Sequence, residues 1–256
     1  MSEPDIGVFY DDLSADYDLI FESWERSMAR QGDTILGLLG RYLPHAESPL
    51  RVLDTAAGIG TQSLPLAQRG CSLTCRDLSP AAIARLRREA AARGLQLDAG
   101  VADMRSVDQT VAQPFDVVLA FDNAVPHLQT DDDVATAFRA FFRALRPGGV
   151  CLLSVRDYEQ VERGVDRVQP YGVRWREGKR HVPLQVWHWV DADHYDVSFY
   201  FIVDEPHGAQ VRCTTARYYA VSAARLLELM SSAGFEQCER NDETIYGPIL
   251  LGRRPG

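Results

Sequence analysis

The sequence has no Cys-x-x-Cys pair, no cluster of metal ligands at a recognised spacing and no apolar run near the roughly 20 residues that span a bilayer. These absences predict neither a metal site nor a membrane partner. The five cysteines are odd in number, and Cys75 and Cys151 fall inside apolar runs. We therefore expect small buried thiols in a reducing compartment.

Basic charge is also scarce. The net charge of -9 argues against a nucleic-acid partner, because phosphate binding needs a basic surface. The one basic run, residues 174–181, is interpreted as a solvated strand pair with its turn. Residues 1–12 contain acidic residues and no basic residue, so no signal peptide is predicted and the expected location is cytoplasmic.

Strand-like and helical segments alternate over residues 50–155, which predicts a parallel sheet with helices on both faces. Strand-like runs separated by turns then predict an antiparallel insert, at residues 173–175, 182–190, 195–203 and 210–219. A helix at 222–232 and two closing strands follow. The predicted fold class is α/β, with a doubly wound, mostly parallel seven-stranded sheet and an antiparallel β insert.

Small residues follow the first strand of this sheet. The strand ends at Asp54, and a turn containing Ala56, Gly58 and Gly60 leads into a helix; the next strand ends at Asp77. In an open α/β sheet, ligands bind where these strand ends meet. Small residues let a ligand approach the backbone, and a carboxylate at the second strand end can accept two hydrogen bonds from a ribose diol. The pattern predicts a nucleoside pocket.

Two nucleoside ligands fit such a pocket. A dinucleotide fold favours Gly-x-Gly-x-x-Gly, but the third glycine place, counted from Gly58, is Ser63. An acidic residue followed by three alternating small residues, Asp54 to Gly60, resembles the class I S-adenosylmethionine-dependent methyltransferases. The resemblance implies a Rossmann-like fold with S-adenosylmethionine as cofactor and S-adenosylhomocysteine as product. It also implies that the antiparallel insert acts as a substrate lid.

On this resemblance the chain divides into four parts. We expect an N-terminal helical cap (1-49), an S-adenosylmethionine-binding core (50-156), the antiparallel lid insert (157-219), and a last helix with the closing strand pair of the core (220-256). The cap is rich in aromatic residues. Since it could cover this chain's own pocket or reach into a partner's, both a monomer and a homo-oligomer remain open.

Three segments are similar to the glycine and sarcosine N-methyltransferases in particular. Residues 121–128 resemble a stretch in which an asparagine faces the substrate and a histidine follows, and Tyr218-Tyr219 also has a counterpart. Residues 146–158 resemble a run whose arginine grips the substrate carboxylate, here Arg156. The resemblance makes Tyr17, Tyr171 and Tyr200 candidates for substrate-facing tyrosines.

The insert carries more aromatic surface than a very small acceptor needs. Trp175, Trp187 and Trp189 all lie in it. Strand alternation puts Trp187 and Trp189 on one face and His188 on the other. These rings are expected either to line the pocket or to form the core of the lid.

Asp103 follows the third strand, where the resemblance implies a carboxylate that accepts from the adenine amino group, with Met104 packed on the ring. Phe121 would lie above the sulfonium. The full set of predicted cofactor-binding residues is Asp54, Ala56, Gly58, Gly60, Asp77, Leu78, Asp103, Met104 and Phe121. The predicted catalytic residues are Asn123, Arg156, His127 and Tyr17.

Plainer structural roles compete for several of these residues. Asp54 could simply anchor the turn, and Asn123 could cap a turn rather than offer its carbonyl to a substrate amine. A histidine after a proline, here His127, is more often a hydrogen-bonding loop residue than a base. Arg156 could form an ion pair with Asp157 or Glu159 instead of binding a carboxylate.

The function predicted from the sequence is transfer of a methyl group from S-adenosylmethionine to a small-molecule acceptor by in-line displacement. The expected acceptor is the nitrogen of a small amine or amino acid. The first alternative is C- or O-methylation of an aromatic, indole-like compound. Alternatives of another class are a nicotinamide-dependent oxidoreductase and a non-catalytic adenosyl-binding protein.

Overall fold

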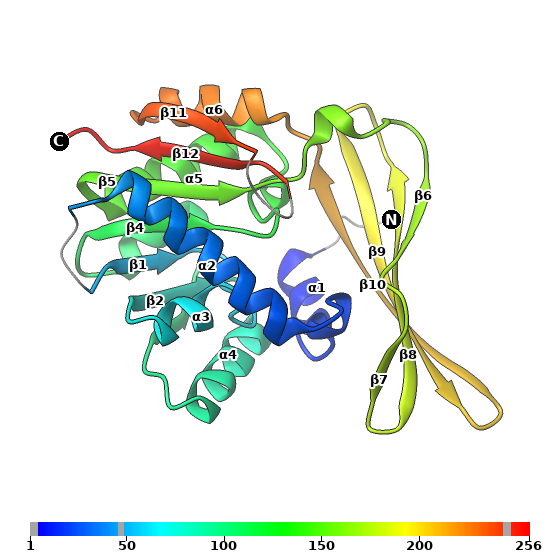
Figure 1. Ribbon diagram of the computed structural model, residues 1–256. Helices are drawn as coiled ribbons and strands as arrows, with labels where there is room; N and C mark the ends of the chain where they lie inside the picture. Colours follow the sequence, from blue (N-terminus) through cyan, green and yellow to red (C-terminus); the bar gives the residue numbers. More distant parts are fainter. Residues whose placement is uncertain (1–4, 46–48, 243–246) are drawn as a thin grey trace.

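A twisted seven-stranded sheet forms the body of the computed structural model, which describes residues 5–45, 49–242 and 247–256 (Figure 1). Parts of the predicted cap (1–4, 46–48) and of the closing segment (243–246) lie outside the described residues. The strand order is β11-β12-β5-β4-β1-β2-β3. The strands are β1 (Arg51–Asp54), β2 (Ser72–Asp77), β3 (Asp98–Val101), β4 (Phe115–Ala120), β5 (Leu145–Ser154), β11 (Glu236–Asn241) and β12 (Ile249–Arg253).

Strands β1 to β5 pair in parallel, while β12 runs antiparallel to both β5 and β11. Helices cover both faces. One buried cluster joins the sheet to α2 (Trp24–Tyr42), α3 (Ser63–Gln68) and α4 (Pro80–Ala92). The other joins it to α5 (Asp131–Ala144), α6 (Ala223–Ser232) and the 3-10 turn η2 (Met104–Thr110). The predicted fold class, doubly wound and mostly parallel, is confirmed.

A cap and a strand pairing set the starts of two elements. α2 begins at Trp24, since the Ser23 hydroxyl caps it by accepting from the Arg26 N–H at 3.3 Å. β5 begins at Leu145, because Leu145 already pairs with Phe115 of β4.

A second sheet stands beside the first (Figure 1). It has the order β10-β9-β8-β6, with β7 also paired to β8. Its strands are β6 (Arg167–Pro170), β7 (Arg174–Arg176), β8 (Lys179–Trp189), β9 (His194–Glu205) and β10 (Gly208–Tyr219). The sequence pattern missed β6, an exposed edge strand: Val168 is 64% exposed, so no apolar alternation marks the segment.

The inner face of this sheet packs on the N-terminal segment. α1 (Ile6–Leu13) and the 3-10 turns η1 (Tyr17–Ile20) and η4 (Tyr158–Gln160) share a buried cluster with the strands of the insert. Trp187 and Trp189 belong to that cluster and His188 faces outward, as alternation predicts. Trp175 does not belong to this cluster, because its side chain is 72% exposed. The expectation that it contributes to the aromatic surface of the site is therefore wrong.

Ion pairs fix the N-terminal segment between the two sheets. Asp18 accepts from Arg85 of α4 at 2.7 Å and from Arg176 of β7 at 2.5 Å. Asp16 pairs with Arg176 and Arg212. The five cysteines form no disulfide, and Cys75 and Cys151 are buried as expected. In the described ranges, no helix is long and apolar enough to cross a membrane.

Candidate active site

The turn after β1 is tied to the end of β2. Gly58 has a φ of +50°, and its N–H donates to Asp77 Oδ2 at 2.7 Å. Asp77 Oδ1 accepts from the Ser79 N–H at 2.9 Å, at the start of α4. Burial raises the pKa of the Asp77 carboxyl, against the opposing effect of these hydrogen bonds. The carboxylate is therefore oriented at the wall of a cavity, with its remaining lone pairs available.

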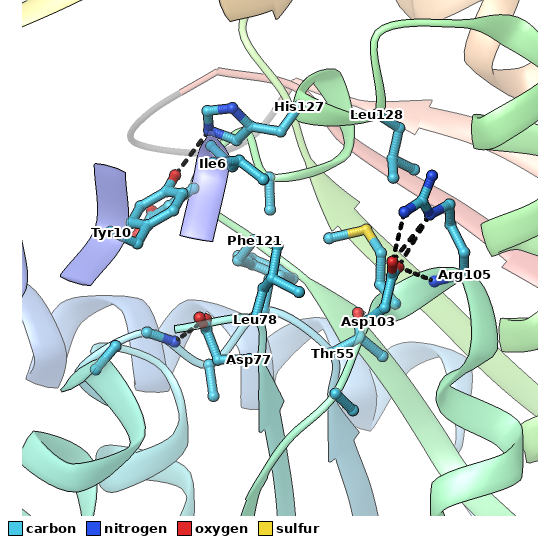
Figure 2. Close-up of a pocket in the computed structure, with 18 of the residues that line it drawn as sticks. Ile6, Tyr10, Thr55, Asp77, Leu78, Asp103, Arg105, Phe121, His127 and Leu128 are labelled. Atoms are coloured by element: carbon cyan, nitrogen blue, oxygen red, sulfur yellow. Dashed lines mark hydrogen bonds and ion pairs between the residues drawn. The ribbon is translucent and has the colours of Figure 1, made fainter. Parts of the chain in front are cut away.

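This first cavity has a volume of about 870 Å³ and lies above the carboxyl ends of the parallel strands. Figure 2 shows Asp77, Leu78 and Phe121 on one side of it and Asp103 with Arg105 on the other. Of the predicted residues it brings together Ala56, Gly58, Asp77, Leu78, Asp103, Met104, Phe121, Tyr17 and His127.

Two predicted ligand-binding residues do not line this cavity. Asp54 is 1% exposed and turned inward, where Oδ2 accepts from Ser63 Oγ at 2.6 Å and Oδ1 from the Ala56 N–H at 3.3 Å. Gly60 has a φ of +99°, and an added Cβ would lie 2.5 Å from Leu86 Cδ1. Both residues build the turn from behind, so the geometry gives them a structural role instead of the predicted ligand contact.

Asp103 is held by its neighbour Arg105. The Arg105 Nη2 donates to Asp103 Oδ2 at 2.6 Å, and its Nη1 reaches Asp133 of α5 at 3.0 Å. Partial burial alone would raise the pKa of Asp103, but the hydrogen bonds from Arg105 outweigh it and lower the pKa. Asp103 is thus a carboxylate held in place on the cavity wall.

A second, smaller cavity of about 220 Å³ adjoins the first. Three residues line both cavities: Tyr10, Tyr17 and Asp122. The cap and the insert contribute the aromatic side chains of Phe21, Tyr171, Phe199 and Tyr218 to the second cavity, and the core contributes Asn123 and Arg156. The two cavities are therefore neighbours, and Tyr10, Tyr17 and Asp122 lie at the junction between them.

Asn123 lies at the second cavity, but its side-chain amide is engaged by the protein. Oδ1 accepts from the Arg156 N–H at 2.9 Å, and Nδ2 donates to the Tyr158 hydroxyl at 2.8 Å. Its φ is +62°, a conformation that asparagine tolerates better than most residues. The geometry therefore favours the turn-capping alternative over a carbonyl offered to substrate.

His127 is similarly engaged. Its Nε2 lies 2.8 Å from the Tyr10 hydroxyl, and its Nδ1 lies 3.3 Å from the Arg217 carbonyl oxygen. A carbonyl can only accept, so Nδ1 carries the proton and Nε2 accepts from Tyr10. Burial lowers the pKa of His127 to about 3. The neutral ring positions Tyr10, which matches the loop hydrogen-bonding alternative rather than a catalytic base.

Arg156 has no acidic partner within 4 Å among the described residues. Asp157 and Glu159, its alternative partners, pair with Arg240 instead. The Arg156 guanidinium lies 4.1 Å from the centre of the Trp187 ring, and Nη1 donates to the Tyr195 hydroxyl at 3.1 Å. Trp187 is therefore a platform beneath the cation and does not line either cavity.

Several residues of the site were not predicted. Asp122, Tyr10 and Tyr218 line the cavities, whereas the candidate Tyr200 faces away with the outer residues of β9. Alternation would have excluded Tyr200, because the large side chains of β9 that face inward are Tyr195, Val197, Phe199 and Phe201. Asp122 is separated from the end of β4 only by Phe121, so it lies close to a strand end, as Asp77 does at the end of β2.

Sequence comparison agrees with this geometry. Residues 52–149 match the family model described as a methyltransferase domain. Over 174 residues the chain is 27% identical to a glycine/sarcosine N-methyltransferase of Parasynechococcus marenigrum, covering 68% of this chain and 57% of the relative. Residues 52–149 therefore form a methyltransferase domain, and the fold of the chain is that of the class I S-adenosylmethionine-dependent methyltransferases. The chain spans about half the length of the curated glycine/sarcosine N-methyltransferases that it matches.

Solved structures show the same methyltransferase fold. The sugar N-methyltransferase KedS8 from Streptoalloteichus sp ATCC 53650 is 22% identical with a TM-score of 0.75, and 94% of this chain and 93% of that chain are covered. CalS10 of Micromonospora echinaspora, an amino pentose methyltransferase solved with S-adenosylmethionine bound, is 19% identical with a TM-score of 0.77, and 99% of each chain is covered. At such identities the likeness extends to the fold alone.

S-adenosylmethionine is the cofactor of this methyltransferase family, and the residues of the first cavity suit it. Asp77 presents a carboxylate for a ribose diol, Asp103 an acceptor for an adenine amine, and Met104 an apolar surface for the ring. Gly58 leaves open space beside the backbone, since an added Cβ would meet nothing within 4 Å.

Gly58 and Gly60 should respond differently to alanine. Gly60→Ala should lower the free energy of unfolding by about 3 kcal/mol, because its methyl would overlap Leu64 and Leu86. Gly58→Ala should cost only about 1 kcal/mol of backbone strain but weaken S-adenosylmethionine binding at least about tenfold, since its methyl enters the cavity. Urea unfolding and calorimetry measure the two effects. Equal losses of stability and binding in both variants would contradict this division of roles.

Asp54 should give stability an unusual pH dependence. Burial raises the pKa of its carboxyl from 3.8 to about 7. A raised folded-state pKa means that this stabilisation is full below pH 3.8 and is lost as the pH rises to about 7. The unfolding free energy of Asp54→Asn minus that of wild type should therefore increase as the pH rises from 3.8 to about 7. Above about pH 7 this difference should stay constant. Urea denaturation of both proteins at matched pH values measures this difference. The pH-dependent contribution of His127 is the same in both proteins and cancels. A difference that does not change with pH would refute the prediction.

Proposed function

We propose that this methyltransferase transfers the methyl group of S-adenosylmethionine to the nitrogen of a small amine that also carries an anionic group, with amino acids as the first class. The observation that supports this most directly is the Arg156 cation on the wall of the second cavity. The second sheet would act as the lid over that cavity.

A buried cation without an acid is costly. Its contacts with Trp187 and Tyr195 offset part of this cost but leave guanidinium N–H groups without a described partner. A carboxylate on the acceptor would supply two parallel charge-assisted hydrogen bonds. An acceptor with an anionic group therefore completes an ion pair that the chain itself leaves incomplete.

The size and walls of the second cavity also favour a small amine. A volume of about 220 Å³ is below the range of roughly 300–1,000 Å³ typical of drug-sized ligands. Its lining includes the aromatic side chains of Tyr17, Tyr171 and Phe199, which would take the place of water around a bound amine. Desolvation lowers the pKa of an amine and so raises the fraction that carries the free lone pair needed for attack.

The donor supplies an activated methyl on a sulfonium, so the protein mainly positions the acceptor. Asp77 and Asp103 would hold the nucleoside in the first cavity, while Arg156 would hold the acceptor in the second. The acceptor nitrogen then lies toward the junction lined by Tyr10, Tyr17 and Asp122. Such positioning can supply effective molarities of roughly 10⁵ M or more.

The glycine/sarcosine relatives support nitrogen as the acceptor atom. The relative from Parasynechococcus marenigrum is named as a glycine/sarcosine N-methyltransferase. The direct test is a methyl-transfer assay read by mass spectrometry with amino acids, the matching decarboxylated amines, amino sugars, indoles and phenols. We expect turnover of amino acids above their decarboxylated analogues. Turnover of indoles or phenols alone would refute the proposal and favour C- or O-methylation.

Arg156→Met should raise the KM of the acceptor amino acid about 100-fold, through loss of a bidentate charged contact. The dissociation constant of S-adenosylmethionine should stay unchanged, and the KM of a decarboxylated amine should change less than about threefold. Steady-state kinetics and calorimetry measure these quantities.

Arg167→Met is the matched control, because Arg167 also lies over the Trp187 ring, at 5.1 Å, but lines neither cavity. Its KM should match that of wild type. Equal losses in the two variants, or an equal loss with the decarboxylated amine, would assign Arg156 a structural role.

A further inference from the structure

Asp122 occupies a constrained position at the end of β4. Its φ is +55° and that of Asn123 is +62°. The Asp122 N–H donates to Ser154 Oγ at 2.8 Å, and the Asn123 N–H donates to the Ser154 carbonyl oxygen at 3.1 Å. These bonds to β5 hold two consecutive residues in the left-handed region, which single Asp and Asn residues tolerate better than most but which glycine adopts at the lowest cost. Strain of this kind persists where the surrounding structure fixes it, and here it places a carboxylate at the junction of two cavities.

The Asp122 carboxylate has no cationic partner among the described residues. It accepts a hydrogen bond from the neutral Gln62 amide. Gln62 Nε2 also donates to Gln31 Oε1 at 2.6 Å, and Gln31 Nε2 donates to Ser27 Oγ at 3.2 Å. A chain of buried neutral groups from α2 therefore orients the carboxylate without neutralising it. Like Arg156, Asp122 is a charge that the protein alone leaves unpaired.

We infer that Asp122 is the group that receives the acceptor amine: it binds the substrate ammonium at the junction and takes its proton before methyl transfer. The inference rests on the proposed function, since it requires an amine acceptor. It also specifies the substrate further, because the ammonium group of the substrate would bind Asp122 and its anionic group would bind Arg156 in the same cavity. The acceptor class is then a zwitterion with a primary or secondary amine.

The proton and electron balance of this step is simple. The substrate enters as an ammonium, and one N–H proton moves to the Asp122 carboxylate, which leaves a neutral amine. The nitrogen lone pair forms the new N–C bond, and the electron pair of the breaking C–S bond stays on sulfur as a neutral thioether. The methylated product leaves as an ammonium, and Asp122 returns its proton to water.

The surroundings of Asp122 favour this transfer. Burial raises the pKa of the Asp122 carboxyl, which brings it closer to that of a desolvated amine. The titratable groups around it are Tyr10 of α1, Tyr17 of η1, Tyr171 of the insert and the inward-facing Asp54, all of which interact electrostatically with its charge. Burial raises the pKa of each of these groups, so the tyrosines stay neutral at physiological pH. Arg156 is the cation of the same cavity and is occupied by the substrate anion.

Asp122→Asn tests the inference, since asparagine tolerates a φ of this sign and keeps the volume. We expect kcat for the best amino acid to fall about 100-fold near pH 7, within the usual contribution of a general base. The deficit should shrink as the pH approaches the amine's own pKa, where neutral amine is supplied by solution. The dissociation constant of S-adenosylmethionine should change less than about twofold.

Asp122→Gly, which relieves the backbone strain, should show the same pH-dependent deficit. Asp132→Asn makes the same charge change at an exposed residue of α5 and should behave as wild type. If wild type methylates amines and Asp122→Asn keeps the wild-type kcat, the inference is overturned and the proposed function stands. The same conclusion follows if the kcat of Asp122→Asn is reduced by the same factor at every pH. Absence of amine turnover by wild type would overturn the proposed function itself.

Discussion

The hydrogen bond from the Gly58 N–H to the Asp77 carboxylate joins the ends of two neighbouring strands, and the site depends on it. It fixes the turn after β1 against the end of β2, and the Ser79 N–H extends the same contact to the start of α4. Behind the turn, Asp54 and Ser63 hold the backbone from inside. The two strand-end carboxylates therefore have different roles: the buried Asp54 fixes the turn, and Asp77 faces the cavity.

The second half of the site is assembled from segments far apart in the sequence. α1 is anchored on α4, since Asp11 accepts from the Ala81 N–H at 3.0 Å. Arg174 Nε donates to the Phe21 carbonyl oxygen at 2.6 Å and so ties the insert to the same segment. These contacts place Tyr10 and Tyr17 over the junction of the two cavities. The cap and the insert therefore complete the second cavity, the proposed acceptor site, while the first cavity lies at the carboxyl ends of the parallel strands.

The strand–helix order, the doubly wound sheet and the strand-end position of Asp77 could be predicted, because they follow from local patterns that tertiary packing reinforces. The inward turn of Asp54 could not, since its direction is decided by a bond to Ser63 nine residues away. Nor could the pairing of Arg156, whose nearby acids are captured by Arg240 of β11. Asp122 carried a strand-end signal, but its role depends on a left-handed backbone that β5 imposes. The edge strand β6 is too exposed to leave an apolar pattern.

Two opposite charges, Asp122 and Arg156, line one small cavity beside the donor site, and the chain pairs neither of them with an acid or a base that the structure describes. A zwitterionic amine bound beside the nucleoside donor would pair both charges, its ammonium with Asp122 and its anion with Arg156. The most direct measurement is calorimetric titration of the purified protein with S-adenosylmethionine and, separately, with NAD. Micromolar binding of S-adenosylmethionine and none of NAD is the predicted result. Binding of NAD alone would contradict the assignment of the first cavity as a methyl-donor site.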